Sequence, residues 1–312
     1  MANCLVTGVA GFIGSHIAER LIKEKHNVVG VDCFTDYYSR SIKERNLQTL
    51  LATEKFDFVE SNLLELELSK LLEGVDYVFH EAAQAGVRAS WGKDFEIYTR
   101  NNVLATQRLL EAAKESELKK FVYASSSSVY GDAKSYPTTE DMTPKPVSPY
   151  GVTKLAGEHL CMLYWKNFHV PTVALRYFTV YGPRQRPDMA FHKFIKAILE
   201  GKPITIYGDG EQTRDFTFVV DAVDANLLAA SADVVGEVFN IGGGSRITVN
   251  GVVEMLEEII GKDANLKHIA KQKGDVRHTA ADITKARKLL GYEPTFDLRK
   301  GLELQVEWMA KL

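Results

Sequence analysis

The feature that most constrains the fold is the stretch VTGVAGFIGSH, which places Gly8, Gly11 and Gly14 between an apolar run and a helical pattern. Glycines at this spacing permit a tight turn and a close approach of the backbone to a pyrophosphate, whose charge then lies at the helix N-terminus. Asp32 ends the next apolar run. A carboxylate there accepts from a ribose 2′-hydroxyl and repels a 2′-phosphate, so the pattern favours NAD over NADP. The alternative is a glycine-rich turn that holds no ligand.

Strand-like and helix-like segments alternate along the first half of the chain. CLVTG precedes the helical pattern FIGSHIAERLIKEK, DYVFHEAA precedes NVLATQRLLEAAKES, and KKFVYAS precedes SPYGVTKLAGEHLCMLYWKN. This order is typical of a parallel sheet covered by helices on both faces. We therefore expect an α/β protein whose residues 1–180 form a Rossmann-type, doubly wound, NAD-binding domain. The alternation of strand-like and helix-like segments ends near residue 181. This change predicts a smaller mixed α/β domain for the substrate in 181–312, with 215–243 returning to the first domain.

Charge and cysteine content limit the partners and the compartment. The 312 residues carry a net charge of −3, so the chain has no excess of cations to neutralise a nucleic-acid backbone. Cys4, Cys33 and Cys161 are widely spaced and form no CxxC or metal-ligand group, which predicts buried thiols in a reducing compartment and no metal site. The N-terminus has no basic leader and glycines interrupt its apolar stretch. We therefore expect neither a signal peptide nor a membrane span, and a cytoplasmic protein.

A tyrosine and a lysine stand four residues apart in VSPYGVTKLAGEHL. Ser148 is the expected N-cap of a helix and Pro149 a first-turn residue, so Tyr150 and Lys154 share one helical face. Lowering a tyrosine pKa from about 10 to about 7 requires roughly 4 kcal/mol. One ammonium at ~5 Å contributes roughly 3 kcal/mol at an effective dielectric constant near 20, and a nicotinamide cation could supply the remainder. Alone the pattern is common on surfaces, but after a dinucleotide loop it indicates an acid/base pair.

On these residues the chain resembles the extended short-chain dehydrogenase/reductase family. The matching pieces are TGVAGFIG, Asp32, HEAA, NNVLAT, SSSSVYG, YGVTK and LRYFTVYGP, and GDGEQTRDFTFVVD extends the match into the second region. Within that family the chain is most similar to the nucleotide-sugar epimerases and dehydratases. The resemblance implies a tightly held NAD that takes a hydride from a sugar carbon and returns it.

The resemblance also implies roles for individual residues. Tyr150 is the expected base, Lys154 orients the nicotinamide ribose and lowers the pKa of Tyr150, and Ser126 bridges Tyr150 and the sugar O4. Asn62 stands where the family often has an aspartate that meets adenine. The expected cofactor-binding residues are Gly8, Gly11, Phe12, Ile13, Gly14, Asp32, Asn62, Ala82, Ala83, Asn102, Ser125, Tyr150, Lys154 and Tyr177.

On the substrate side, the family binds the diphosphate with arginines and places an aromatic ring near the uracil. The corresponding positions are Arg214 in the RD motif, Arg277 in KGDVRH and Tyr207 in ITIYGDG. Arginine suits a phosphate because its planar fork donates two parallel hydrogen bonds. Arg88 and Arg186 are candidates to grip the pyrophosphate or the moving sugar, and the sequence does not divide these roles. For each arginine the alternative is a solvated charge.

Four consecutive serines separate the possible reactions. The 4,6-dehydratases have Asp-Glu before Val-Tyr-Gly and the UDP-glucuronate decarboxylases have Ser-Glu, whereas this chain has Ser127 and Ser128. Together with AAQAGVRASW and GPRQRPDMAFHKFI, the pattern resembles the UDP-glucuronate 4-epimerases. Neutral hydroxyls from Ser127, Ser128 and Thr179 could donate to a sugar carboxylate, which a glutamate would repel.

The resemblance thus implies an NAD-dependent isomerase that interconverts UDP-glucuronate and UDP-galacturonate through a transient 4-keto sugar, without loss of CO2. Two alternatives stay open: a UDP-glucose/UDP-galactose 4-epimerase, and a non-catalytic NAD-binding sensor or scaffold. The sensor is disfavoured because the Tyr150–Lys154 pair is present. Family members often pair helices equivalent to Asn102–Ser116 and Pro149–Asn167 into a homodimer interface. The alternative is that their apolar residues all face their own sheet.

Overall fold

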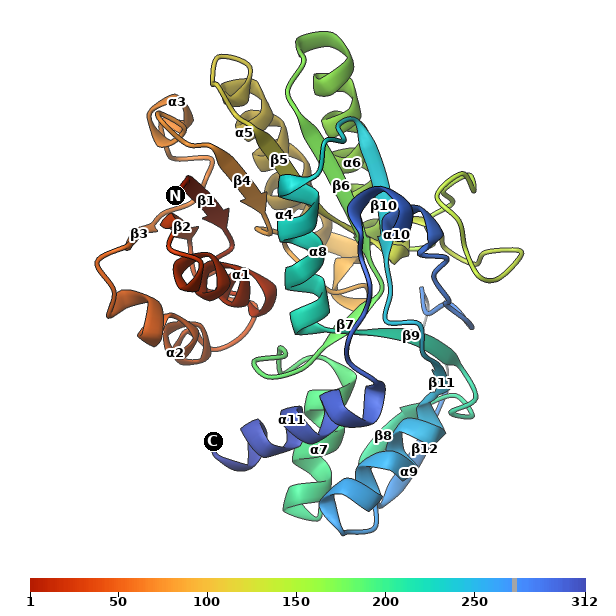
Figure 1. Cartoon of the computed structure of the whole chain (residues 1–312). Coiled ribbons are helices and arrows are strands. Elements are labelled where there is room, and N and C mark those ends of the chain that lie inside the picture. Colours follow the sequence, from red (N-terminus) through yellow and green to blue (C-terminus); the bar gives the residue numbers. More distant parts are fainter. Residues whose placement is uncertain (271–273) are drawn as a thin grey trace.

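A seven-stranded sheet organises the larger part of the computed structural model, which describes residues 1–270 and 274–312 (Figure 1). Its strands are β1 (Asn3–Thr7), β2 (Asn27–Asp32), β3 (Phe56–Glu60), β4 (Tyr77–His80), β5 (Lys120–Ser126), β6 (Thr172–Tyr177) and β10 (Glu237–Ile241). They lie in the order β10-β6-β5-β4-β1-β2-β3, and each neighbouring pair is parallel. The predicted doubly wound α/β fold is confirmed. The strand order reverses between β1 and β4, which opens a crevice at their carboxyl ends.

Helices cover both faces of this sheet, because its strands are apolar on both sides. One face packs against α1 (Phe12–Lys23), α2 (Arg40–Leu51) and α8 (Val219–Ser231), and the other against α3 (Leu68–Leu71), α5 (Ala105–Ala113) and α6 (Pro149–Phe168). Strand β5 shows the alternation. Val122 and Ala124 belong to the first apolar cluster, whereas Phe121 and Tyr123 belong to the second.

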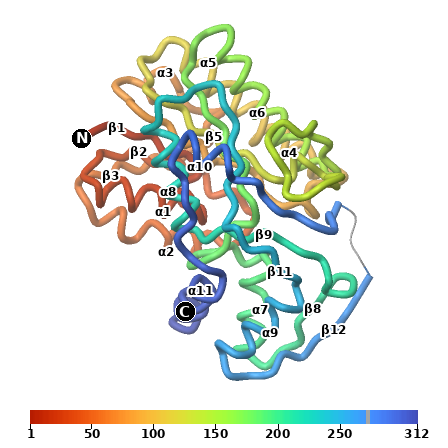
Figure 2. The backbone as a smooth tube through the Cα atoms, turned by 45° about the vertical axis from the view of Figure 1, so that its right-hand side comes forward, coloured from red at the N-terminus to blue at the C-terminus, as the bar shows by residue number. Residues whose placement is uncertain are grey.

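A smaller lobe lies below the sheet in Figure 1. Its elements are β7 (Thr179–Tyr181), α7 (Ala190–Glu200), β8 (Ile204–Tyr207), β9 (Thr213–Phe218), β11 (Arg246–Thr248), α9 (Val249–Ile260), β12 (Leu266–Ile269) and α11 (Leu298–Ala310). They include a three-stranded sheet, β11-β9-β7, and a parallel pair, β12-β8. The chain returns to the larger part twice (Figure 2): α8 packs on α1 and β10 pairs with β6, and later α10 (Thr284–Leu290) packs on β10.

Two expected helices differ in their regularity. The helix predicted from Pro149 begins there, and the Ser148 hydroxyl accepts from the Gly151 amide at 3.1 Å as its N-cap. The helix expected near 102–116 is interrupted instead. A short helix, α4 (Phe95–Tyr98), runs into a π-helical stretch at Thr99–Leu104 before α5 begins. Such stretches often occur at functional sites, and this one passes beside the crevice.

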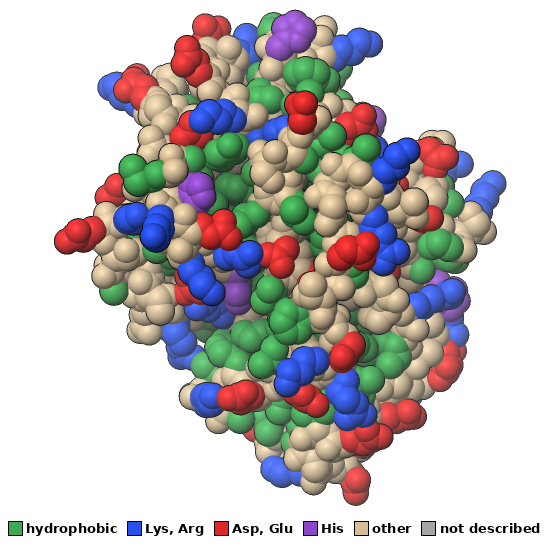
Figure 3. All heavy atoms as spheres, viewed as in Figure 1, with side chains coloured by type: hydrophobic (Ala, Val, Ile, Leu, Met, Phe, Trp, Pro, Cys, Tyr) green, Lys and Arg blue, Asp and Glu red, His purple; other side chains and the backbone are tan. Residues whose placement is uncertain are grey.

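The surface carries charges of both signs. Figure 3 shows acidic and basic side chains interspersed over one face of the molecule. In the two described ranges, no helix combines the length and the apolar character needed to cross a membrane.

Candidate active site

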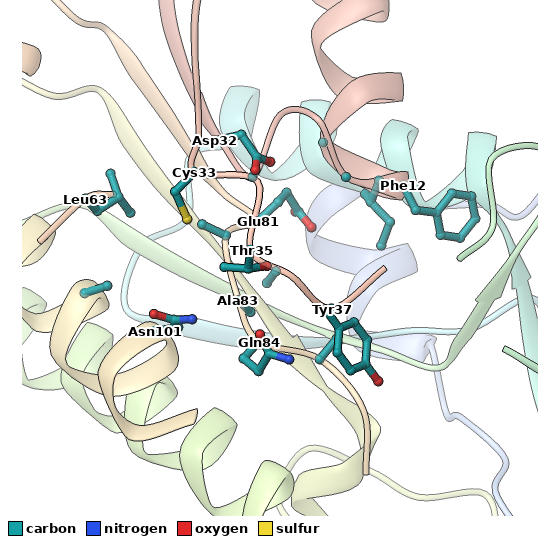
Figure 4. Close-up of a pocket in the computed structure, with 18 of the residues that line it drawn as sticks. Phe12, Asp32, Cys33, Thr35, Tyr37, Leu63, Glu81, Ala83, Gln84 and Asn101 are labelled. Carbon is teal, nitrogen blue, oxygen red and sulfur yellow. The ribbon is translucent and has the colours of Figure 1, made fainter. Parts of the chain in front are cut away.

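A cavity of about 1150 Å³, a volume that includes open solvent at its mouth, lies at the carboxyl ends of the central strands (Figure 4). This is the place where open α/β sheets bind ligands. Of the residues predicted to bind cofactor or substrate, the cavity is lined by Gly8, Gly11, Phe12, Ile13, Gly14, Asp32, Asn62, Ala82, Ala83, Ser125, Tyr150, Lys154, Tyr177 and Arg186.

The glycine loop forms a cradle that side chains would fill. Gly8 has φ +70°, and a Cβ on it would lie 2.7 Å from the backbone nitrogen of Ala82. A Cβ on Gly14 would collide with the Gly8 carbonyl. Gly11 is the N-cap residue of α1, so no side chain at the cap competes for the amides of the first turn. These amides and the helix dipole suit the pyrophosphate of a dinucleotide.

Asp32 is fixed at the end of β2, beside the loop. One of its oxygens accepts from the Phe34 amide at 2.8 Å and the other from the Ala10 amide at 3.1 Å. Burial raises the pKa of Asp32, while these amides and the Lys43 ammonium oppose the increase. The position fits a carboxylate that receives ribose hydroxyls. The expectation that all three thiols are buried is wrong for Cys33, which is exposed because it follows Asp32 at the open end of the strand.

Asn102 has a structural contact where a cofactor contact was expected. Its side-chain oxygen accepts from the Gln84 amide at 2.7 Å, and its amide nitrogen donates to the Gln84 carbonyl and the Thr153 hydroxyl, both at 3.0 Å. Asn102 therefore clamps the backbone that follows β4. The cavity wall is formed by its neighbour, Asn101.

Tyr150 and Lys154 both line the cavity from α6. The Lys154 ammonium donates to the Ala124 carbonyl at 2.7 Å, which aims it across the end of β5. Burial raises the pKa of Tyr150; the Arg186 guanidinium is the strongest opposing influence, followed by the Ser126 hydroxyl. The sequence predicted that Lys154 and the nicotinamide lower this pKa, whereas in the structure Arg186 and Ser126 are the groups that lower it.

The four serines form an anchored turn. Ser125 donates to Glu158 at 2.7 Å, and Glu158 pairs with Arg176 at 2.5 and 3.0 Å within the protein interior. Arg176 in turn donates to the Tyr130 hydroxyl at 2.8 Å, beyond the last serine. One buried ion pair therefore holds both ends of the segment 126–128. Within it the Ser126 hydroxyl accepts from the Ser128 amide at 3.2 Å, so these hydroxyls belong to a defined turn.

The three arginines of the loops 86–91 and 182–188 have different surroundings. Arg184 pairs with Glu19 of α1 at 2.8 Å. Arg186 lines the cavity. Arg88 lies 3.9 Å above the Tyr207 ring and pairs with Asp275 at 2.7 Å. The structure thus brings together Arg88 and the predicted uracil neighbour, Tyr207, outside the lining of the main cavity.

Two further predicted arginines lie on the smaller lobe. Arg214 donates to the Val276 carbonyl at 2.8 Å. Arg277 is exposed and pairs with Asp209 at 2.7 and 2.9 Å. Thr179 begins β7 and is half-buried. These three residues also lie outside the lining of the main cavity.

Glu81 is a cavity residue for which the sequence predicted no role, although it stands in the HEAA motif. Its carboxyl accepts from the Tyr177 hydroxyl at 2.7 Å. The available signal was its position directly after β4, since polar residues at the carboxyl ends of parallel strands face the crevice.

Comparisons with known proteins agree with this arrangement. The model of the NAD dependent epimerase/dehydratase family matches residues 4–242. The UDP-glucuronic acid 4-epimerase from Bacillus cereus, solved with UDP-glucuronic acid and NAD, is 50% identical with a TM-score of 0.97, over 99% of each chain. The uncharacterized UDP-glucose epimerase YtcB of Bacillus subtilis (strain 168) is 49% identical over 99% of this chain and 98% of its own length. The UDP-glucuronate 4-epimerase of Thermodesulfobacterium geofontis (strain OPF15) is 41% identical over 99% and 96%.

Proposed function

The chain belongs to the NAD dependent epimerase/dehydratase family, and we propose that it interconverts UDP-glucuronate and UDP-galacturonate by inversion at C4. The observation that carries this proposal is the anchored turn 126–128, which contains no carboxylate and places the Ser126 hydroxyl beside Tyr150. The curated relative from Thermodesulfobacterium and the solved structure from Bacillus cereus, both named for this activity, support the same choice.

The cavity fits NAD, which when bound supplies an acceptor and donor for the hydride of C4. The amides after Gly11 would hold its pyrophosphate, and Asp32 would receive the hydroxyls of its adenosine ribose. Tyr150 takes the proton of the sugar O4, directly or through Ser126. It returns the proton after the 4-keto sugar has rotated to present its other face. The cations Lys154 and Arg186 stabilise Tyr150 in its ionised form.

The serine turn accounts for inversion without decarboxylation. A 4-keto glucuronate carries its carboxylate β to the ketone, so it loses CO2 when the bond to the carboxylate aligns with the ketone orbitals. We assign Ser127, Ser128 and Thr179 to the carboxylate as hydrogen-bond donors that hold it out of that alignment. The diphosphate and uracil are assigned to Arg88, Arg214, Arg277 and Tyr207, which gather on the side of the smaller lobe.

A neutral UDP-hexose 4-epimerase is the second candidate. The Bacillus subtilis relative carries the name of a UDP-glucose epimerase, and serine hydroxyls can also serve a neutral sugar. Measuring kcat/KM of the purified protein for UDP-glucuronate and for UDP-glucose distinguishes the two candidate functions. We expect a preference of at least about 100-fold for the uronate, because donors placed for a carboxylate are left unpaired by a hydroxymethyl group. A preference for UDP-glucose would favour the second candidate.

We also propose a homodimer in the cytoplasm. Helix α6 exposes Val152, Leu163 and Phe168 by 48, 53 and 50%, and Leu104 beside it is 41% exposed. Apolar side chains gathered on one pair of helices are typical of a protein–protein interface. Light scattering should give about twice the chain mass of 34.8 kDa. The free cysteines fit a reducing compartment.

A further inference from the structure

Glu81 lies at the inner wall of the cavity and is held from two other elements. Tyr177, at the end of β6, donates its hydroxyl to the Glu81 carboxyl at 2.7 Å. The same hydroxyl accepts from the side-chain amide of Asn226, on α8, at 2.6 Å. Figure 4 draws Glu81 among the side chains that line the cavity. The Glu81 carboxyl is therefore held in a fixed position. The proposed proton transfer by Tyr150 does not use it.

The charges around Glu81 come from three elements. On α6, Lys154 is stabilised in its charged form by Glu81, against the burial that lowers the pKa of this lysine. On the same helix, Glu81 raises the pKa of Tyr150. His80, the preceding residue, is buried between the hydroxyls of Thr7 and Thr106, and burial lowers its pKa, so it stays neutral. On β6, Tyr177 is the hydrogen-bond donor. Lys154 is therefore the cation among these groups that Glu81 balances.

We propose that Glu81 is a positioning residue that sets the charge at the nicotinamide end of the cavity. Its carboxylate fixes the Tyr177 hydroxyl, supplies a counter-charge for Lys154, and favours the cationic, oxidised form of the cofactor over the neutral, reduced form. The inference rests on the proposed function in taking NAD as the cofactor. Its consequence is a short-lived 4-keto sugar, because a site that favours oxidised cofactor returns the hydride to the sugar.

The test is the ratio of the dissociation constants for NAD and NADH, measured by competition titration without any sugar. Glu81→Gln keeps an oxygen that can accept from Tyr177 but removes the charge. Glu81→Asp keeps the charge, and Glu73→Gln removes a charge from an exposed turn as the matched control. We expect Glu81→Gln to reduce the preference for NAD by about fivefold or more, while Glu81→Asp and the control stay within about twofold of the wild type.

The pH dependence adds a second readout that a merely structural role would not move. Burial raises the pKa of Glu81 and the Tyr177 hydrogen bond lowers it. The wild-type preference for NAD should therefore fall as the pH is lowered through the pKa of Glu81, and Tyr177→Phe should move that fall to higher pH. Glu81→Gln should show no such fall, and the alkaline limb of its kcat should move to lower pH, because Lys154 loses its counter-charge.

Equal preference for NAD in the wild type and in Glu81→Gln would overturn the inference. So would an unchanged pH dependence of the preference in that variant. Because the titrations contain no sugar, these outcomes are independent of the substrate. Failure of the wild type to turn over UDP-glucuronate would count against the proposed function alone.

Discussion

The guanidinium of Arg186 pairs with both oxygens of Asp188, at 2.9 and 3.0 Å, on the wall of the cavity that holds Tyr150. The Tyr37 hydroxyl also donates to Asp188, at 3.2 Å. Two side chains therefore share one carboxylate, and among the groups that lower the pKa of Tyr150 the Arg186 guanidinium is the strongest. The base has a fixed cation that belongs to the protein and does not depend on the redox state of the cofactor.

Replacing that cation should move the acidic limb of the pH–rate profile. Tyr150 acts as a base only when ionised, so activity is present above its pKa and is lost below it. Arg186→Gln removes a charge that lowers this pKa, so the acidic limb of kcat should move to higher pH by about one unit. The exposed Lys193→Gln on α7 should leave the limb in place. If kcat falls but the acidic limb stays at the same pH, Arg186 acts in substrate binding and does not set the pKa of Tyr150.

Removing the phenol itself should stop the chemistry and spare the binding. Tyr150→Phe deletes the group that exchanges the O4 proton. General acid–base groups of this kind raise the reaction rate by about 10²–10⁴-fold. We expect kcat to fall by at least about 10³-fold, while the affinity for NAD, measured by titration, stays within about threefold. Turnover near the wild-type value would refute the role of Tyr150 as the base.

The buried pair behind the serine turn should be important for stability. Arg176 and Glu158 are each 4% exposed, so removing one partner leaves an uncompensated charge inside the protein. We expect Arg176→Met to lower the free energy of unfolding by about 3–5 kcal/mol in urea titrations. Lys311→Met, which breaks the exposed pair with Glu307, should leave the free energy of unfolding nearly unchanged. Similar values for the two variants would show that the buried pair does not stabilise the fold more than an exposed one.

A carboxylate in the serine turn should select against the uronate. Ser128→Asp places a negative charge beside the assigned carboxylate site, and repulsion of two charges near 4 Å is worth up to about 4 kcal/mol at an effective dielectric constant of 20. We expect kcat/KM to fall at least about tenfold more for UDP-glucuronate than for UDP-glucose. Ser128→Ala tests the loss of the hydroxyl alone. Equal losses on both sugars in the aspartate variant would remove this turn from carboxylate recognition.

Features set by local spacing could be predicted from the sequence. The glycine loop, Asp32 and the helix that begins at Pro149 depend on residues within one strand–helix unit, and the structure places them as expected. The parallel sheet follows from the alternation of apolar and amphipathic segments. The π-helical stretch at Thr99–Leu104 could not be predicted, because a helical sequence pattern cannot show where one additional residue enters a turn.

Contacts between distant segments required the structure. Glu81 meets Tyr177, 96 residues away, only because β4 and β6 end at the same edge of the sheet. The pairing of Glu158 with Arg176 depends on how α6 packs against β6. Asn102 and Asn101 could not be separated by pattern, since the irregular helix decides which of them faces the cavity.

The most direct test of C4 inversion without decarboxylation is the product formed from UDP-glucuronate by the purified wild-type protein. Proton NMR identifies the sugar, and a coupled assay measures the CO2 released in the same reaction. We expect UDP-galacturonate as the product, with CO2 at no more than a few per cent of turnover, on the order of an incidental side reaction. A UDP-pentose formed together with one CO2 per turnover would contradict it.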